Sequence, residues 1–131
     1  MKLLVTGATG LIGKNLITHA KQRRISIHFL TTRKGECINS DGLKGFFWNP
    51  EQDEIDDSCF EGVDTLIHLA GANISKPWTA KNKKDILESR LNGTRLLKKT
   101  LDRLKIKMNS ICCAGAIGIY PDSIDDIHDE N

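Results

Sequence analysis

The sequence has few aromatic residues and lacks any long apolar run. Aromatic residues make up 5% of the 131 residues, and Tyr120 is the single tyrosine. The longest stretch without a charged residue runs from Met108 to Pro121, which is shorter than the roughly 20 residues of a membrane-spanning helix. Thr6 and Gly7 interrupt the apolar start too early for a secretion signal. We therefore expect a soluble, cytoplasmic protein.

Cysteine is also sparse, and its spacing is not that of a metal site. No C-x-x-C pair occurs among the four cysteines, which are Cys37, Cys59, Cys112 and Cys113. We therefore expect reduced thiols and no bound metal. Cys112 and Cys113 could form a redox pair, but adjacent cysteines at the end of a strand more often pack in the interior.

Size and composition are those of one globular domain. Hydrophobic residues make up 39% of the chain and charged residues 27%, with a net charge of +2. Basic residues gather in 81–107, whereas the segments 51–64 and 122–130 are acidic. The basic segment has no interleaved aromatic residues, which indicates a solvated helix face rather than a nucleic-acid surface. We expect neither a nucleic-acid partner nor a membrane partner.

Short apolar runs alternate with helical periodicity along the chain, a pattern typical of parallel β-α-β units. A helix to about Arg24 follows the first strand, and a longer helix capped by Thr79 follows the fourth. The five predicted strands are Lys2–Thr6, Ser26–Thr31, Gly45–Trp48, Val63–Ala70 and Asn109–Ala114. The buried stripe predicted on the longer helix is Ile86, Arg90, Gly93, Leu97, Leu101 and Leu104.

A glycine-rich turn, Thr6-Gly7-Ala8-Thr9-Gly10-Leu11-Ile12-Gly13, joins the first strand to its helix. Gly7 permits a tight turn, Gly10 lets a pyrophosphate approach the backbone, and Gly13 lets helix and strand pack closely. Because the turn opens a β-α-β unit of suitable length, it predicts a dinucleotide site; a tight turn without a ligand is the alternative. The predicted contacts in this turn are Gly7, Thr9, Gly10, Leu11, Ile12 and Gly13.

The end of the second strand indicates which dinucleotide binds. NAD sites usually place a carboxylate about 20 residues past the glycines, to bind the ribose 2′-hydroxyl. Arg33 occupies that place here, after Thr31 and Thr32 and before Lys34. Two cations and two hydroxyls suit a 2′-phosphate, which favours NADP over NAD. Alternatively, the two basic residues only cap an exposed strand end.

Several further motifs together resemble the atypical extended short-chain dehydrogenase/reductases, the branch named for sugar-nucleotide epimerases. They follow the glycine turn in order as Leu30-Thr31-Thr32-Arg33, Trp48-Asn49-Pro50, Gly62-Val63-Asp64, His68-Leu69-Ala70-Gly71-Ala72-Asn73-Ile74, Trp78-Thr79, Ser89-Arg90-x-x-Gly93-Thr94-Arg95 and Gly118-Ile119-Tyr120. The resemblance implies that Leu69, Ala70 and Gly71 line the ribose and pyrophosphate side of the cofactor. It also implies that Trp48 and Asn49 lie near the adenine.

The fold expected for residues 1–131 is an α/β, Rossmann-type, doubly wound parallel sheet with strand order 3-2-1-4-5. The resemblance implies chains about twice this long, so the later strands and the substrate lobe are expected to be missing. The chain is then either an amino-terminal fragment or a naturally short protein, and residues 121–131 form an acidic tail. The uncovered edge of the fifth strand predicts self-association.

The catalytic pattern of such reductases is not met. They use a Tyr-x-x-x-Lys pair and a hydroxyl after the fifth strand. Here Ile124 stands four residues after Tyr120, and Cys113-Ala114 stands where a serine is expected. We therefore name no catalytic residue. Two functions stay open: the cofactor half of an NADP-dependent oxidoreductase or epimerase, or a non-catalytic NADPH-binding module. A third possibility is an inactive fragment. For His68, the alternatives are a structural residue of its strand and a proton-transfer group.

Overall fold

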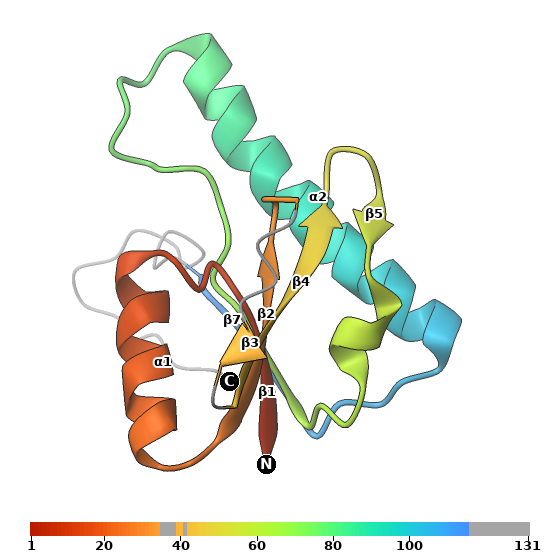
Figure 1. Cartoon of the computed structure of the whole chain (residues 1–131). Helices are drawn as coiled ribbons and strands as arrows, with labels where there is room; N and C mark the ends of the chain where they lie inside the picture. The colour runs from red at the N-terminus through yellow and green to blue at the C-terminus, as the bar shows by residue number, and fades with distance from the viewer. Residues whose placement is uncertain (35–38, 41, 116–131) are drawn as a thin grey trace, which may run out of the picture.

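The computed structural model describes residues 1–34, 39–40 and 42–115, which form a twisted sheet with one helix on each face (Figure 1). The parallel strands lie in the order β4-β2-β1-β6-β7, which confirms the predicted topology. Their bounds are β1 (Lys2–Thr6), β2 (Ser26–Thr31), β4 (Leu43–Asn49), β6 (Thr65–His68) and β7 (Ser110–Cys113).

Two short antiparallel strands flank β4 and were not expected. β3 (Asn39–Ser40) pairs with its first half, and β5 (Glu54–Ile55) pairs with its last residues. A strand of two residues has no alternating pattern to recognise, because its pairing depends on where the turn brings the chain back.

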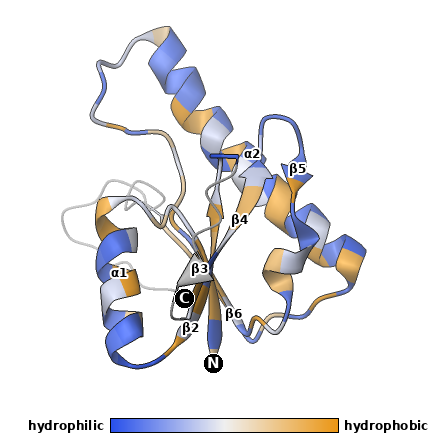
Figure 2. Ribbon diagram, viewed as in Figure 1, coloured by the Kyte–Doolittle hydropathy of each residue, from blue (hydrophilic) through white to orange (hydrophobic). Residues whose placement is uncertain are grey.

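The side chains of β1 show how the two faces are divided. Leu3 and Val5 join the apolar cluster under α1 (Leu11–Gln22), whereas Leu4 joins the cluster under α2 (Ala80–Leu104). Successive side chains of a strand point to opposite faces, so a continuous apolar run is the pattern of a strand covered on both sides. Figure 2 shows the central strands as largely hydrophobic and the outer surface of α2 as largely hydrophilic.

Only the second half of α2 packs on the sheet, which corrects part of the predicted stripe. Arg90 is exposed and Ile86 is half-buried, because the first half of the helix extends past the sheet (Figure 1). The residues of α2 that are buried are Gly93, Leu96, Leu97, Thr100 and Leu101.

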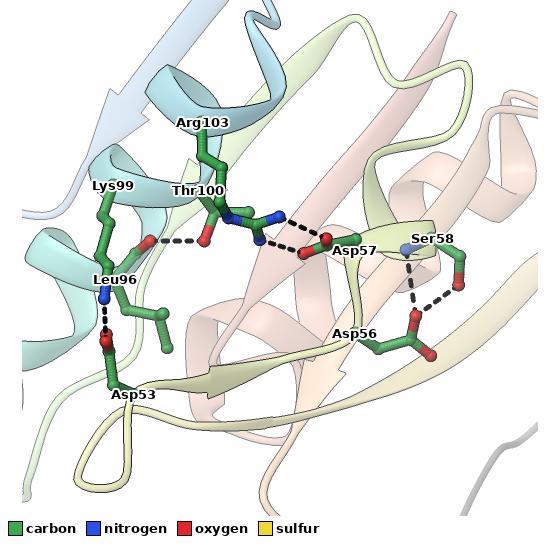
Figure 3. A network of polar contacts seen from close by, with 8 residues as sticks. All are labelled: Asp53, Asp56, Asp57, Ser58, Leu96, Lys99, Thr100 and Arg103. Carbon is green, nitrogen blue, oxygen red and sulfur yellow. Dashed lines mark hydrogen bonds and ion pairs between the residues drawn. The ribbon is translucent and has the colours of Figure 1, made fainter.

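Ion pairs tie the second half of α2 to the chain that follows β4 (Figure 3). Arg103 donates to both carboxylate oxygens of Asp57 at 2.6 and 2.8 Å, and Lys99 pairs with Asp53. Asp57 lies in a short 3-10 helix (Asp57–Phe60) that begins after Asp56, whose carboxylate accepts the backbone N–H of Ser58. The acidic segment 51–64 is therefore joined by ion pairs to basic residues of α2.

Candidate cofactor-binding site

The glycine turn after β1 is closed by its own backbone. Gly7 has φ +70°, a left-handed conformation, and its carbonyl accepts the N–H of Gly10 at 3.0 Å. A Cβ on Gly13 would lie 2.3 Å from the same carbonyl oxygen, which leaves no space for a side chain there. The two outer glycines thus perform the steric roles that the sequence assigned to them, and Thr9 and Gly10 lie exposed between them.

The helix that follows presents its first turn to solvent. Gly10 is the N-cap of α1 and makes no side-chain capping bond, and the first turn contains no acidic residue. Leu11 is 83% exposed and Ile12 is 63% exposed. The first amides of a helix have no partner inside it, so this turn can donate hydrogen bonds to an anion from the positive end of the helix.

The loop after β6 lies directly against this turn. A Cβ on Gly7 would be 2.9 Å from the backbone nitrogen of Ala70 and from the carbonyl carbon of Leu69. Thr6 fastens the loop, because its hydroxyl accepts the N–H of Leu69 at 3.1 Å and that of Ala70 at 3.0 Å. The structure therefore brings the predicted loop residues and the glycine turn together at the carboxyl ends of β1 and β6.

Thr6 belongs to the glycine-turn motif, but its role could not be predicted from the sequence. It is fully buried and is partnered in register with His68 across the sheet. The sequence does contain one indication of this role, since β1 and β6 are both largely apolar and each ends in a polar residue, Thr6 and His68. That indication depends on knowing that β1 and β6 pair, and the sequence alone does not supply their register.

Two residues of α2 hold the other side of the loop. Ser89 accepts the N–H of Ala72 at 2.9 Å, and Arg90 donates to the carbonyl of Ala72 at 3.4 Å. A Cβ on Gly71 would be 3.1 Å from the guanidinium of Arg90. The first two residues of the Ser-Arg-x-x-Gly motif thus position the predicted cofactor loop. Its glycine, Gly93, leaves space for the His68 ring.

Arg33 and Lys34 are exposed just beyond the carboxyl end of β2. The backbone N–H of Arg33 donates to the hydroxyl of Thr31 at 3.2 Å, and the ammonium of Lys34 lies 5.1 Å from the centre of the Phe47 ring. The cations and hydroxyls selected from the sequence are therefore grouped at one strand end.

Trp48 is buried, whereas a residue that contacts a bound adenine is expected at the surface. It is 4% exposed in the core under α2, with its ring at right angles to His68 and 6.3 Å from it. Its neighbour Asn49 binds the turn that follows β4, through Gln52 and the backbone N–H of Glu51. The contact of Trp48 and Asn49 with a bound adenine stays a prediction.

A cavity of about 660 Å³ opens beside the loop, between the first half of α2 and the end of β7. Ile74, Trp78 and Ile86 give it apolar walls, and Lys83 and Arg90 bring two cations. His68 lines this cavity as well as a second one of about 340 Å³ between α2 and β7.

At the end of β7, as far as the structure describes it, no hydroxyl stands where the reductase serine is expected, and the hydroxyl that lines the cavity is that of Thr94 on α2. Cys113, Ala114 and Gly115 line it where a reductase serine is expected. Cys112 and Cys113 are exposed free thiols, so the predicted burial of this pair is wrong for the part of the chain that the structure describes. The reason is that β7 is the edge strand of the sheet that the described residues form, with β6 as its neighbour. Tyr120 and the tail 121–131 lie outside the described residues.

Burial shifts the acid–base behaviour of several groups. It lowers the pKa of His28 and of His68 and raises that of the Cys59 thiol, which stays protonated. Within the described ranges no cluster of three or more His, Cys, Asp or Glu side chains could hold a metal ion. No described helix is long and apolar enough to cross a membrane.

A family model supplies the decisive comparison. The model described as the NAD dependent epimerase/dehydratase family matches residues 3–131. The chain belongs to this family. An epimerase family protein of Staphylococcus epidermidis is 31% identical over 122 residues, which are 92% of this chain and 39% of that protein. The epimerase family protein YfhF of Bacillus subtilis is 30% identical over 130 residues, 95% of this chain and 41% of that one. This family member thus spans about two-fifths of the length of these relatives.

Solved structures share the fold. The human epimerase family protein SDR39U1, solved with NADPH, matches all of this chain with a TM-score of 0.72 and 22% identity, over 42% of its own length. The protein MoeE5, solved with UDP-glucose and NAD, matches with a TM-score of 0.75 and 19% identity, over 100% of this chain and 42% of that one. At these identities the likeness establishes the Rossmann-type fold.

Proposed function

We propose that this chain is the NADP(H)-binding part of an oxidoreductase or epimerase of this family. The observation that carries the proposal is the interlocked site in which Gly7 lies against the loop at Leu69 and Ala70, beside the uncapped first turn of α1. A pyrophosphate placed there receives backbone hydrogen bonds from Leu11 and Ile12 without a side chain in its way.

The choice of NADP(H) depends on the end of β2. Arg33 and Lys34 provide positive charge where an NAD site usually carries a carboxylate, and guanidinium groups bind phosphate through two hydrogen bonds. Among the solved structures of similar fold, one was determined with NADPH and another with NAD, so proteins of this fold bind either cofactor.

The bound nicotinamide would supply or accept a hydride. The residues of this chain bind and orient the dinucleotide: the first turn of α1 holds its phosphates, and the loop 69–71 lines its ribose side. The cavity beside that loop, with Ile74 and Trp78 on its walls, lies where the reacting end of an extended dinucleotide would enter. A sugar-nucleotide or another alcohol is the proposed substrate class, and the cytoplasm is the proposed location.

A non-catalytic NADPH-binding module is the second candidate. Cys113 and Ala114 favour it, because neither side chain supplies the hydroxyl that orients a substrate oxygen in related reductases. Binding of NADPH without any reduction of NADP+ by sugar nucleotides would support the module. Turnover of a sugar nucleotide by the chain would contradict it.

Titration of the purified chain with NADPH and with NADH, followed by nicotinamide fluorescence, tests the proposal. We expect tighter binding of NADPH, and we expect Arg33→Ala to reduce the preference by about tenfold or more, because it removes a charge-assisted pair with the 2′-phosphate. Arg23→Ala is the matched control, since Arg23 is an exposed cation at the opposite end of α1.

Equal loss of affinity in both variants would mean that only net charge matters. Absence of binding by a folded chain would contradict the proposal as a whole.

A further inference from the structure

A buried three-way hydrogen bond lies behind the cofactor loop. The Thr6 hydroxyl oxygen, at the carboxyl end of β1, is 3.1 Å from the backbone nitrogen of Leu69 and 3.0 Å from that of Ala70. It is also 2.7 Å from Nδ1 of His68, the last residue of β6. Thr6 is 0% exposed and His68 is 6% exposed, so the bond between their side chains is buried, whereas Leu69 and Ala70 are half-buried.

Counting hydrogens fixes the direction of each bond. A hydroxyl has one hydrogen to donate and two lone pairs that accept. The amides of Leu69 and Ala70 can only donate, and both are directed at the two lone pairs of the Thr6 hydroxyl oxygen; the Leu69 amide is shared with the Thr6 backbone carbonyl oxygen, which is more distant at 3.3 Å. The hydroxyl hydrogen must therefore point to Nδ1 of His68, which has to be unprotonated. His68 is then a neutral imidazole with its hydrogen on Nε2.

The surroundings of His68 favour this neutral form. Its ring lies edge-on to Trp48, and a Cβ on Gly93 would be 3.2 Å from Cε1, so α2 approaches the ring closely there. Burial is the cause that lowers the pKa of the imidazole. The titratable groups on the elements around it are Cys113, in register on β7, and the α2 side chains that line the same cavities, which are Lys83, Arg90, Lys98 and Asp102.

We propose that His68 is a positioning residue for the dinucleotide: by accepting the hydrogen of Thr6, it orients that hydroxyl to hold the amides of Leu69 and Ala70 against Gly7. The proposal builds on the proposed function, because the loop matters through the cofactor that it lines. It gives His68 a role other than proton transfer, since Nδ1 is committed to Thr6 inside the protein.

A consequence of this arrangement is a proton-sensitive site. A hydrogen added at Nδ1 would face the hydroxyl hydrogen across 2.7 Å. Thr6 would then have to turn its hydroxyl towards the loop and release one of the two amides. Protonation of His68 therefore loosens the loop and weakens cofactor binding.

The first test is a spectroscopic one on the unmodified chain. Nitrogen-15 chemical shifts of the histidine rings distinguish an unprotonated from a protonated Nδ1. We expect His68 to show an unprotonated Nδ1 and a hydrogen on Nε2 at neutral pH. Observation of a hydrogen on Nδ1 would overturn the proposal, whether or not any nucleotide binds.

The second test is the pH profile of NADPH affinity in matched variants. His68→Asn places an amide oxygen near the position of Nδ1, so it can still accept from Thr6 but does not titrate. We expect wild-type affinity to fall as the pH decreases below about 6.5, by about fivefold or more once the pH has passed the lowered pKa of His68, and the affinity of His68→Asn to change much less. His68→Leu, which has no acceptor, should bind weakly at every pH.

His19→Asn is the control, because His19 is an exposed histidine on α1. It should keep the wild-type profile. The 2′-phosphate of NADPH also titrates in this range, but equally for every variant. Superimposable profiles of wild type and His68→Asn would overturn the proposal.

Hydrogen exchange separates this proposal from the proposed function. If no variant binds either nucleotide, the amides of Leu69 and Ala70 still report on the Thr6 bond. Their protection should decrease with falling pH in the wild type and stay constant in His68→Asn. Identical protection in both proteins would contradict the role of His68 even without a ligand.

Discussion

At the scale of single residues, the two buried histidines make folding sensitive to pH. His28 is 7% exposed, with Nδ1 2.7 Å from the carbonyl oxygen of Cys59, and burial lowers the pKa of both His28 and His68 below about 6.5. The unfolded chain thus binds more protons than the folded chain between the lowered pKa values and about pH 6.5. Stability should rise with pH through this interval and be lost as the pH falls through it.

Urea unfolding at several pH values measures this effect. His28→Gln combined with His68→Asn should flatten the dependence of the unfolding free energy in that interval, whereas His19→Asn should leave it unchanged. An unfolding free energy that rises towards acid pH would contradict the attribution of this pH dependence to His28 and His68.

Gly13 illustrates two residue-scale effects of opposite sign. Alanine is favoured over glycine in a helix by roughly 1 kcal/mol, but a Cβ on Gly13 would lie 2.3 Å from the Gly7 carbonyl oxygen and 2.8 Å from Cα of Ala8. Backbone atoms so close force the helix away from the turn. We expect Gly13→Ala to destabilise the protein by about 1–3 kcal/mol and to abolish nucleotide binding.

Gly10→Ala is the matched comparison in the same turn. Its Cβ would be 3.2 Å from the Gly7 carbonyl oxygen, a contact that small shifts relieve. This variant should lose affinity for the pyrophosphate with a much smaller change in the unfolding free energy. Thermal unfolding and NADPH titration of both variants separate the two effects, and equal destabilisation would contradict the distinction.

At the scale of elements, α2 consists of two halves with different support. Its buried residues begin at Gly93, so the first half depends mainly on its own hydrogen bonds and on its cap. Thr79 is that cap, and its hydroxyl accepts the N–H of Asn82 at 3.2 Å, as the sequence predicted. Lys81, Lys83 and Lys84 place positive charge at this end, which makes the cap more important.

Thr79→Ala should therefore cause local fraying. We expect amide exchange in the first turns of α2 to become about fivefold faster, equivalent to about 1 kcal/mol, with little change in global unfolding. Thr79→Asp keeps the cap and adds a favourable negative charge, so it should restore or exceed wild-type protection. A uniform change of exchange along the whole helix would contradict the two-part description.

At the scale of the whole molecule, β7 is the exposed edge strand of the part of the chain that the structure describes. All four residues of β7 are exposed, Ile111 by 56%, and among the described residues its only strand neighbour is β6. An exposed strand edge with apolar side chains is a template for pairing with another chain. We expect concentration-dependent self-association.

Sedimentation over a wide range of protein concentration measures this association. Ile111→Lys should shift the equilibrium towards monomer, because a charge on the strand disfavours pairing with a second copy. Leu87→Lys, at a residue of α2 that is 58% exposed, is the control and should not change it. Equal effects of the two substitutions would indicate nonspecific apolar contact instead of pairing along β7.

The sequence by itself determined the parallel strands, their order and the glycine turn. β1 and β2 have the bounds that their apolar runs predict, and the phosphate-binding turn lies at the start of α1, because local pattern and backbone sterics suffice for these features. The sequence also placed Arg33 beyond β2 and the cap of α2 at Thr79.

Only the tertiary structure decided how the loop after β6 is held. The bonds of Thr6 to Leu69 and Ala70 span more than 60 positions of the chain, and those of Ser89 and Arg90 to Ala72 join two elements. Such contacts follow from the register of paired strands and from the place where a helix crosses them. Neither leaves a periodic signal in the sequence, because these bonds join segments that come together only after the chain has folded.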